Sequence, residues 1–258
     1  MRKTLGIDVS KHNGCIEWQK VKSSGVDFVI IRAGYGYTYT DPCFVYNLRN
    51  AIANDIKVGV YWFIYALSMD EAIKNANKCH SVIAPYIKDI TMKVWCDFEY
   101  DSDNYANKYG VAFSKENRTA MVKAFCECLK EYGYDVGVYA NRDYLRYKYN
   151  DLSAYPLWYA LYGSTKDRAC LMWQHTSKGC VDGINGNVDM NYLYTEESEY
   201  YNKPEFTLVE SLEKIGVDSS YQNRSKIASV NGIANYTGTA TQNIKMLEML
   251  QAGKLLKI

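Results

Sequence analysis

The chain has 258 residues, enough for one large domain or for one domain with a small appendage. Its 30 basic residues against 29 acidic ones leave a net charge of +1, so we do not expect a nucleic-acid partner. An apolar content of 48% with 23% charged residues is typical of a soluble globular protein with a large core.

Apolar strands alternate with helices through the first half of the chain. The predicted strands are 5–10, 28–34, 58–65, 92–100 and 135–140, and the predicted helices are 18–24, 44–54, 69–83 and 114–132. Three more strands follow at 157–160, 171–174 and 188–191, with little helix between them. Strands that are apolar throughout and alternate with helices indicate a parallel sheet covered on both faces. We therefore predict an irregular (β/α)8-type, TIM-like barrel with reduced later helices.

The fourth of these strands ends in two acids, Asp97 and Glu99, separated by one residue. Residues i and i+2 of a strand point to the same face, which would place the two carboxyl groups side by side, roughly 7 Å apart along the chain. Crowded like charges raise the pKa of one acid and keep it protonated near neutral pH. An isolated Asp-x-Glu equally fits a strand that runs into a solvated loop.

The same arrangement recurs at other strand ends. Asp8 and Asp189 are predicted at the carboxyl ends of the first and eighth strands, so acids would close strands one, four and eight. In a barrel of this type the site lies at the carboxyl ends of the strands, which favours a functional site over solvated loops. Further candidates for ligand contact near these ends are Arg32, Tyr61, Trp62, Tyr65 and Gln174, although core packing explains the aromatic residues equally well.

The character of the chain changes after Tyr192. We predict a barrel domain over 1–194, a polar linker over 195–204 and a small, mainly helical domain over 205–258. Thr207 with Glu210 and Thr239 with Gln242 both fit the capping box that begins a helix. A domain of this size is marginal alone, so we expect it to dock, to self-associate or to do both.

The cysteines and histidines show no metal-ligand spacing. The eight cysteines are expected to be free thiols that act as small buried hydrophobic residues, and the three histidines are dispersed. The chain also shows no apolar signal region at its start and no run that could span a bilayer. We expect no metal, no cofactor, no membrane partner and no signal peptide.

Six segments, in order over residues 5 to 194, resemble the glycoside hydrolase family 25 lysozymes, the Chalaropsis-type muramidases of many phage endolysins. One departure lies in the third strand, where the family often has Tyr-His-Phe and this chain has Tyr61-Trp62-Phe63. The matching segments are Gly6-Ile7-Asp8-Val9-Ser10 with His12-Asn13-Gly14, Phe28-Val29-Ile30-Ile31-Arg32-Ala33, Val58-Gly59-Val60-Tyr61-Trp62-Phe63, Trp95-Cys96-Asp97-Phe98-Glu99, Trp173-Gln174, and Gly183-Ile184-x-Gly186-x-Val188-Asp189-Met190-Asn191.

The resemblance implies hydrolysis of the β-1,4 bond from N-acetylmuramic acid to N-acetylglucosamine in peptidoglycan. Glu99 would be the general acid. Asp97 would either orient the substrate's own 2-acetamido group as nucleophile or leave water activation to Asp8 or Asp189. Arg32, Tyr61, Trp62, Tyr65 and Gln174 would contact the sugars.

Residues 223–255 resemble the C-terminal cell-wall-binding domains of clostridial phage endolysins, on segments such as Asn231-Gly232-Ile233 and Asn235-Tyr236-Thr237-Gly238. Residues 205–258 would then bind a wall polymer, and could form a homo-oligomer or associate with a C-terminal fragment made from an internal start near Met190. A phage lysin would stay in the host cytoplasm until lysis and then act at the wall.

Three rival hypotheses remain open from sequence. The barrel could be a wall lectin that has lost hydrolysis, a bacterial autolysin of the same family, or an enzyme that acts on another sugar polymer such as chitin. Fold alone does not separate them.

Overall fold

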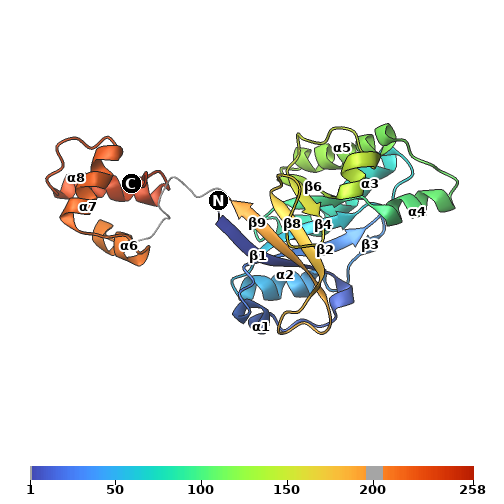
Figure 1. Ribbon diagram of the computed structural model, residues 1–258, viewed down its shortest axis with the longest axis horizontal. Helices are drawn as coiled ribbons and strands as arrows, with labels where there is room; N and C mark the ends of the chain where they lie inside the picture. The colour runs from blue at the N-terminus through green and yellow to red at the C-terminus, as the bar shows by residue number, and fades with distance from the viewer. Residues whose placement is uncertain (1, 196–205) are drawn as a thin grey trace. The chain divides into compact units, whose positions relative to one another are not determined.

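The computed structural model describes residues 2–195 and 206–258, and it divides into two compact units, Met1–Thr195 and Glu196–Ile258 (Figure 1). The predicted linker, 195–204, lies outside the described residues except for Thr195. Within the described ranges, no helix is both long enough and apolar enough to cross a bilayer.

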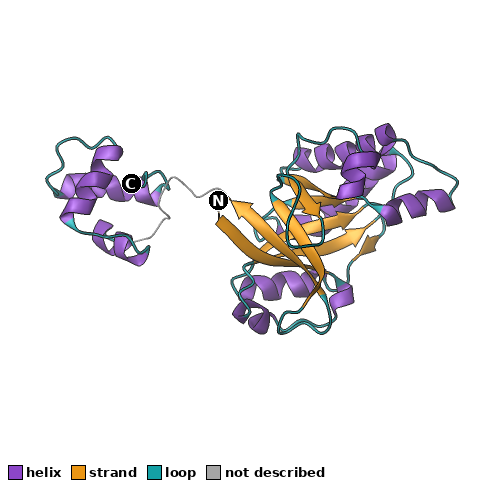
Figure 2. Ribbon diagram, viewed as in Figure 1, coloured by secondary structure: helices purple, strands orange, loops and turns teal. Residues whose placement is uncertain are grey.

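The first unit is an eight-stranded closed barrel (Figures 1 and 2). Its sheet order is β1-β9-β8-β7-β6-β5-β4-β2, and the pairing of β1 with β2 closes it. A short strand, β3, pairs antiparallel with the end of β2. The strands are β1 (Arg2–Val9), β2 (Phe28–Tyr35), β3 (Tyr39–Thr40), β4 (Lys57–Phe63), β5 (Val94–Asp97), β6 (Val136–Asn141), β7 (Leu157–Ala160), β8 (Met172–Gly179) and β9 (Val188–Thr195).

The helices cover the first half of the barrel. They are α1 (Trp18–Ser23), α2 (Phe44–Ala53), α3 (Met69–Ile83), α4 (Tyr100–Lys108) and α5 (Lys115–Glu131). Short 3-10 helices lie at Lys11–Asn13 and Ala84–Tyr86, and a π-helix at Tyr144–Lys148. Between β7 and β9 the described chain has no helix, which confirms the expectation of a barrel with reduced later helices (Figure 2).

The prediction that all eight strands run parallel is wrong for the last one. Seven strands are parallel, but β9 pairs antiparallel with both β8 and β1. Residues 180–187 join β8 to β9 without a helical crossover, and a connection that short returns the chain in the opposite direction. The expectation that Glu99 lies on the fourth strand is also wrong, because β5 ends at Asp97 and Glu99 is the N-cap of the unpredicted helix α4.

Alternation along the strands sorts side chains into two cores. One set points into the barrel and forms an interior cluster that includes Phe28, Trp95 and Trp158. Large rings there lie beside glycines on the neighbouring strand: Gly6 is the register partner of Phe28, and Gly137 that of Trp95. A Cβ added at either glycine would come within 2.3 Å of its partner's ring, so these two positions exclude a side chain.

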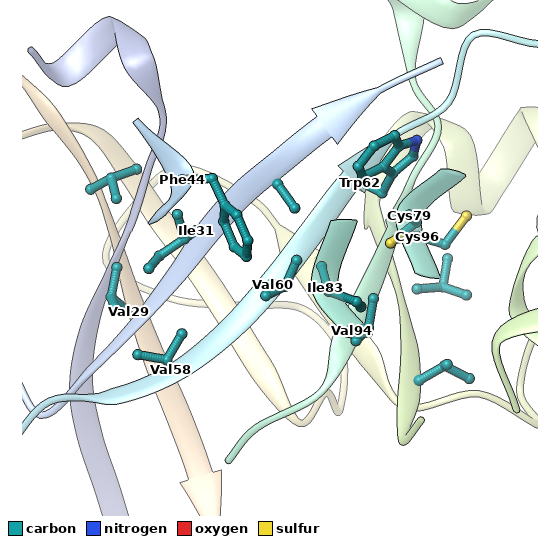
Figure 3. Packing of buried hydrophobic residues seen from close by; sticks show 14 of the residues in the cluster. Val29, Ile31, Phe44, Val58, Val60, Trp62, Cys79, Ile83, Val94 and Cys96 are labelled. Atoms are coloured by element: carbon teal, nitrogen blue, oxygen red, sulfur yellow. The ribbon is translucent and has the colours of Figure 1, made fainter. Parts of the chain in front are cut away.

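The other set points outward and packs under the helices. Figure 3 shows part of this layer, where Val58, Val60 and Trp62 of β4 lie near Cys79 and Ile83 of α3. All eight cysteines are free, as expected, but only Cys79, Cys96 and Cys126 are buried; the expectation that all are buried is wrong.

Over its described residues, 206–258, the second unit has three helices, α6 (Leu208–Lys214), α7 (Tyr221–Val230) and α8 (Ala240–Gln251). Its core includes Leu212, Ile227, Met246 and Leu250. The capping boxes predicted at Thr207 and Thr239 are both present. The chain's last residues are tied to the end of α7, because the Asn231 side chain both accepts from the Leu256 amide and donates to the Leu256 carbonyl.

Candidate active site

Inward-facing polar side chains gather at one rim of the barrel. Asp8 and Asp97 lie at or next to the carboxyl ends of the parallel strands β1 and β5. Asp189 is the second residue of β9, and it reaches the same rim because β9 runs antiparallel and pairs Asp189 with Asp8. Glu99 follows β5 by two residues. The structure thus brings together all four acids that the sequence singled out.

Asp8 is held by two side-chain amides. Asn191 Nδ2 donates to Asp8 Oδ2 at 2.7 Å, and Gln174 Nε2 donates to the same oxygen at 3.0 Å. Each amide is itself positioned from the barrel interior, since Trp158 Nε1 donates to Asn191 Oδ1 at 2.7 Å and the Tyr139 hydroxyl donates to Gln174 Oε1 at 3.0 Å. This buried network fixes the orientation of the Asp8 carboxyl group.

Asp8 and Asp189 interact directly. Burial raises the pKa of Asp8 well above its ordinary value, and the charge of Asp189 raises it further. Burial also raises the pKa of Asp189, while its hydrogen bond with Asp8 lowers it. Burial and the neighbouring carboxyl group thus favour the neutral form of Asp8 more than in a free aspartate.

Asp97 is the most buried of the acids. It is 6% exposed, and its Oδ1 atom is buried without a hydrogen-bond partner. Burial raises its pKa well above the ordinary value, the charges of Glu99 and Asp8 add to that effect, and Arg32 opposes it. A buried oxygen without a partner is costly, which marks Asp97 as a residue kept for function and not for stability.

Glu99 has the properties of an acid that exchanges its proton near neutrality. Burial, followed by the charges of Asp101 and Asp189, raises its pKa from 4.5 to about 7. Its side chain lines a cavity of about 330 Å³ at the rim, together with Tyr100, Tyr139, Asn141, Arg142, Asp143, Ala160, Leu161 and Tyr162. A carboxyl group of this kind can donate a proton to a leaving group at pH 7.

Arg32 is a residue of β2, and its charge acts on Asp97. Its Nε donates to Asp41 Oδ2 at 2.8 Å, while its Nη2 atom is buried without a hydrogen-bond partner. Tyr61 lies close enough for the two to influence each other's ionisation, and burial raises the pKa of Tyr61 well above its ordinary value. Arg32 is therefore held by Asp41 through Nε, and its charge acts on the neighbouring Asp97 and Tyr61.

The remaining candidates for sugar contact are three aromatic residues, Tyr61 and Trp62 on β4 and Tyr65 just after it. Tyr65 is partly exposed and packs against Tyr35, Phe63 and Tyr105 beside the rim. Trp62 is fully buried, and its Nε1 donates to the Gly36 carbonyl at 3.0 Å. As Figure 3 shows, Trp62 points into the layer under the helices, so the expectation that it contacts sugar is contradicted. Neighbouring residues of a strand face opposite sides, and Tyr61 takes the inner one.

Sequence reasoning missed several residues of the site. Asn191 and Tyr139 could have been found, because they occupy inward positions two residues from Asp189 and Gly137 on their strands. Asp41, Arg142 and Tyr162 lie in connecting segments, where no periodicity identifies them. Among the described residues, no group of three potential metal ligands is close enough to hold an ion.

Comparison with known proteins agrees with this geometry. Residues 7–184 match the model of the family described as glycosyl hydrolases family 25. The autolytic lysozyme of Clostridium acetobutylicum is 27% identical over 190 residues, which are 72% of this chain and 54% of that protein. The chain thus spans about half the length of this curated relative.

Two phage-type relatives are also similar. The structure of the CTP1L endolysin, whose activity is regulated by a secondary translation product, has a TM-score of 0.61 and 26% identity, covering 75% of this chain and 67% of that one. The L-alanyl-D-glutamate peptidase of Listeria phage A118 is 51% identical over 47 residues, 18% of this chain and 17% of the peptidase.

Proposed function

The chain belongs to family 25 of the glycosyl hydrolases, and from this premise we propose that it hydrolyses the β-1,4 bond from N-acetylmuramic acid to N-acetylglucosamine in bacterial peptidoglycan. The observation that carries the proposal is the set of four acids at one rim, of which Glu99 has a pKa of about 7. A protonated acid beside ionisable carboxyl groups is what glycosidic-bond cleavage requires.

Glu99 acts in this proposal as the general acid. It lines the rim cavity, where the oxygen of the scissile bond can reach it. Its raised pKa leaves a large fraction protonated at neutral pH, and donation to the departing oxygen leaves the carboxylate ready to accept a proton from water in the second step.

Asp97 acts in this proposal through the substrate. Its carboxyl group, at the rim beside Glu99, can accept a hydrogen bond from the N–H of the 2-acetamido group, which orients the acetamido oxygen toward the anomeric carbon. Asp8 is less suited to activating water, because two amides already donate to its Oδ2 atom and its raised pKa makes it a poorly ionised base. These contacts favour substrate-assisted cleavage over direct water activation by Asp8.

The sugar contacts follow from the same rim. Arg32 lies beside Asp97, Tyr61 faces inward beside the acids, and Tyr65 offers a partly exposed ring at the edge. Gln174 is committed to Asp8 and Tyr139, so its role is to position Asp8.

The second unit acts in this proposal as a module that binds a wall polymer. A peptidase and this chain have different catalytic domains, so a stretch that they share at 51% identity over 47 residues is best explained as a common targeting module. That length fits the 206–258 unit and is far shorter than the matched barrel. The role that fits this architecture is a phage endolysin held in the host cytoplasm until lysis.

An association through 205–258, with a second copy or with a C-terminal fragment begun near Met190, is also part of the proposal. Its support is the likeness to the CTP1L endolysin, whose activity a secondary translation product regulates. Two bands from recombinant expression, one of them retained with the full chain on a sizing column, would support the fragment. A single full-length band would refute it.

The decisive experiment is digestion of purified clostridial peptidoglycan, followed by borohydride reduction and identification of the new reducing ends. Reduced muramic acid that is absent with Glu99→Gln is the expected result. Reduced glucosamine would instead assign a glucosaminidase. Wall binding without any new ends would refute hydrolysis and support a lectin.

A further inference from the structure

Arg142 lies directly after β6 and lines the same rim cavity as Glu99. Its side chain is 41% exposed, so the guanidinium can be reached from solvent. A cation that lines the same cavity as Glu99 is unexpected in a site that binds only neutral sugars. A neutral N-acetylhexosamine offers the guanidinium group no charged partner.

The carboxylate that pairs with Arg142 is shared with a second cation. Asp167 Oδ2 lies 3.6 Å from Arg142 Nε and 3.2 Å from Arg146 Nη2, so one carboxylate is shared by two guanidinium groups. Its other oxygen accepts from the Tyr159 hydroxyl at 2.6 Å. Asp167 therefore does not occupy all of the donors of the Arg142 guanidinium.

A second aspartate near Arg142 accepts a hydrogen bond from a tyrosine and, within the described chain, forms no ion pair with Arg142. Asp143 also lines the cavity, and its Oδ2 accepts from the Tyr100 hydroxyl at 3.0 Å. In the described part of the chain, the ion pair of Arg142 is with Asp167 and not with Asp143. The Arg142 guanidinium therefore keeps N–H donors for an anion that enters the cavity.

Muramic acid differs from glucosamine in its lactyl group, which carries either a free carboxylate or a stem peptide with carboxylates of its own. We propose that Arg142 is a specificity-determining residue that binds a carboxylate of this lactyl–peptide arm in the cavity beside Glu99. The proposal rests on the muramidase function proposed above and names the charged part of its substrate. It also gives a reason for rejecting chitin, whose sugars lack the arm.

Arginine suits this task because its planar fork matches a carboxylate with two parallel hydrogen bonds. The contact lies on an arm of the sugar and not at the reacting bond, so it stabilises the ground state and the transition state alike. Its loss is expected to raise KM and to leave kcat nearly unchanged.

The test uses the full chain and soluble, uncross-linked peptidoglycan strands in three forms: intact, stripped of stem peptides by an amidase so that only the lactyl carboxylate remains, and with all carboxyl groups amidated. KM and kcat are measured for wild type, Arg142→Gln, Arg142→Lys and Arg146→Gln. Arg146→Gln is the matched control, since Arg146 contacts the same Asp167 without lining the cavity.

On intact strands, Arg142→Gln is expected to raise KM roughly tenfold, as for loss of a charged hydrogen bond, with Arg142→Lys intermediate and Arg146→Gln unchanged. On amidated strands the variant and wild type should have the same, higher KM. The lactyl carboxyl group of intact strands is bound in an amide to the stem peptide and is freed only on stripping. A KM penalty on intact strands that disappears on stripped strands therefore assigns a stem-peptide carboxylate, and a penalty on stripped strands assigns the lactyl carboxylate.

An Arg142→Gln penalty of equal size on amidated strands, or an equal effect of Arg146→Gln, would overturn the inference while leaving the muramidase intact. Absence of new reducing ends with wild type on every strand would instead refute the proposed function itself.

Discussion

Asp8 and Asp189 are register partners across the antiparallel strands β1 and β9, so two carboxyl groups face each other at the rim of the barrel. Like charges placed directly opposite each other across a strand pair destabilise the fold. Here the raised pKa of Asp8 favours its neutral form, which relieves the repulsion, and the amides of Asn191 and Gln174 donate to its Oδ2 atom.

Asp189→Asn removes one of these charges, so we expect it to lower the raised pKa of Asp8 and to stabilise the fold at pH 7 by up to about 1 kcal/mol. An acid with a raised pKa in the folded state loses stability as pH rises, and the variant removes part of that loss. Urea unfolding at pH 5 and pH 7 measures the effect, with the exposed Asp182→Asn as control. Equal destabilisation of Asp189→Asn at both pH values would contradict it.

Glu99→Gln is expected to lower kcat by about a thousandfold, because an amide cannot donate the proton that general acid catalysis supplies. In the wild type, kcat/KM should fall as pH rises through about 7, where Glu99 ionises. Asp101→Asn removes a charge that raises the pKa of Glu99 and should shift this decline to lower pH. Release of reducing ends between pH 5 and 9 measures both, with the exposed Asp89→Asn as control. A decline at the same pH in Asp101→Asn would argue against Glu99 as its source.

Ionisation of the Glu99 carboxyl group also affects the free energy of unfolding. The folded state retains the Glu99 proton up to about pH 7, whereas the unfolded chain loses it near 4.5, so wild-type stability falls with rising pH in this window. Glu99→Gln has no such loss and should be more stable than wild type at pH 8, by about 2 kcal/mol after allowance for partial exposure. Urea unfolding at pH 4 and pH 8 tests this. Parallel stability curves for the two proteins would refute it.

Asn191→Leu removes both a donor to Asp8 and the acceptor of the Trp158 indole N–H. A buried N–H left without a partner costs about 1–3 kcal/mol, so we expect a loss of stability of that size and a fall in kcat. Denaturant unfolding and reducing-end assays measure the two effects. Full activity in this variant would show that Asp8 needs no positioning by Asn191.

Trp62→Phe tests the assignment of Trp62 to the core. It removes the hydrogen bond to the Gly36 carbonyl and some packing, and should lower the free energy of unfolding by about 1–2 kcal/mol while KM stays within about twofold. Tyr61→Phe, on the inner face of the same strand, should instead change the kinetics. A large rise in KM for Trp62→Phe at unchanged stability would return Trp62 to the substrate site.

Much of the barrel could be predicted from the chain, because apolar runs and alternation are local properties. They placed α3 at its observed bounds and identified strands such as β2 and β7 within one residue at each end. The same alternation, applied strictly, would have assigned Tyr61 to the interior and Trp62 to the outer core. Glu99 was expected on a strand because the apolar run before it gave no sign that a helix begins at Tyr100.

The sequence by itself therefore determined the family, the strand pattern and the acids to be considered. Only the tertiary structure decided which of these groups meet. Asp189 lies near the start of its strand, and it reaches the rim only because β9 runs antiparallel to β1. The amide of Asn191 on Asp8, and Arg142 beside Glu99, likewise depend on contacts between distant segments. Periodicity reports which face a side chain takes, but strand direction and pairing depend on non-local contacts that no local pattern encodes.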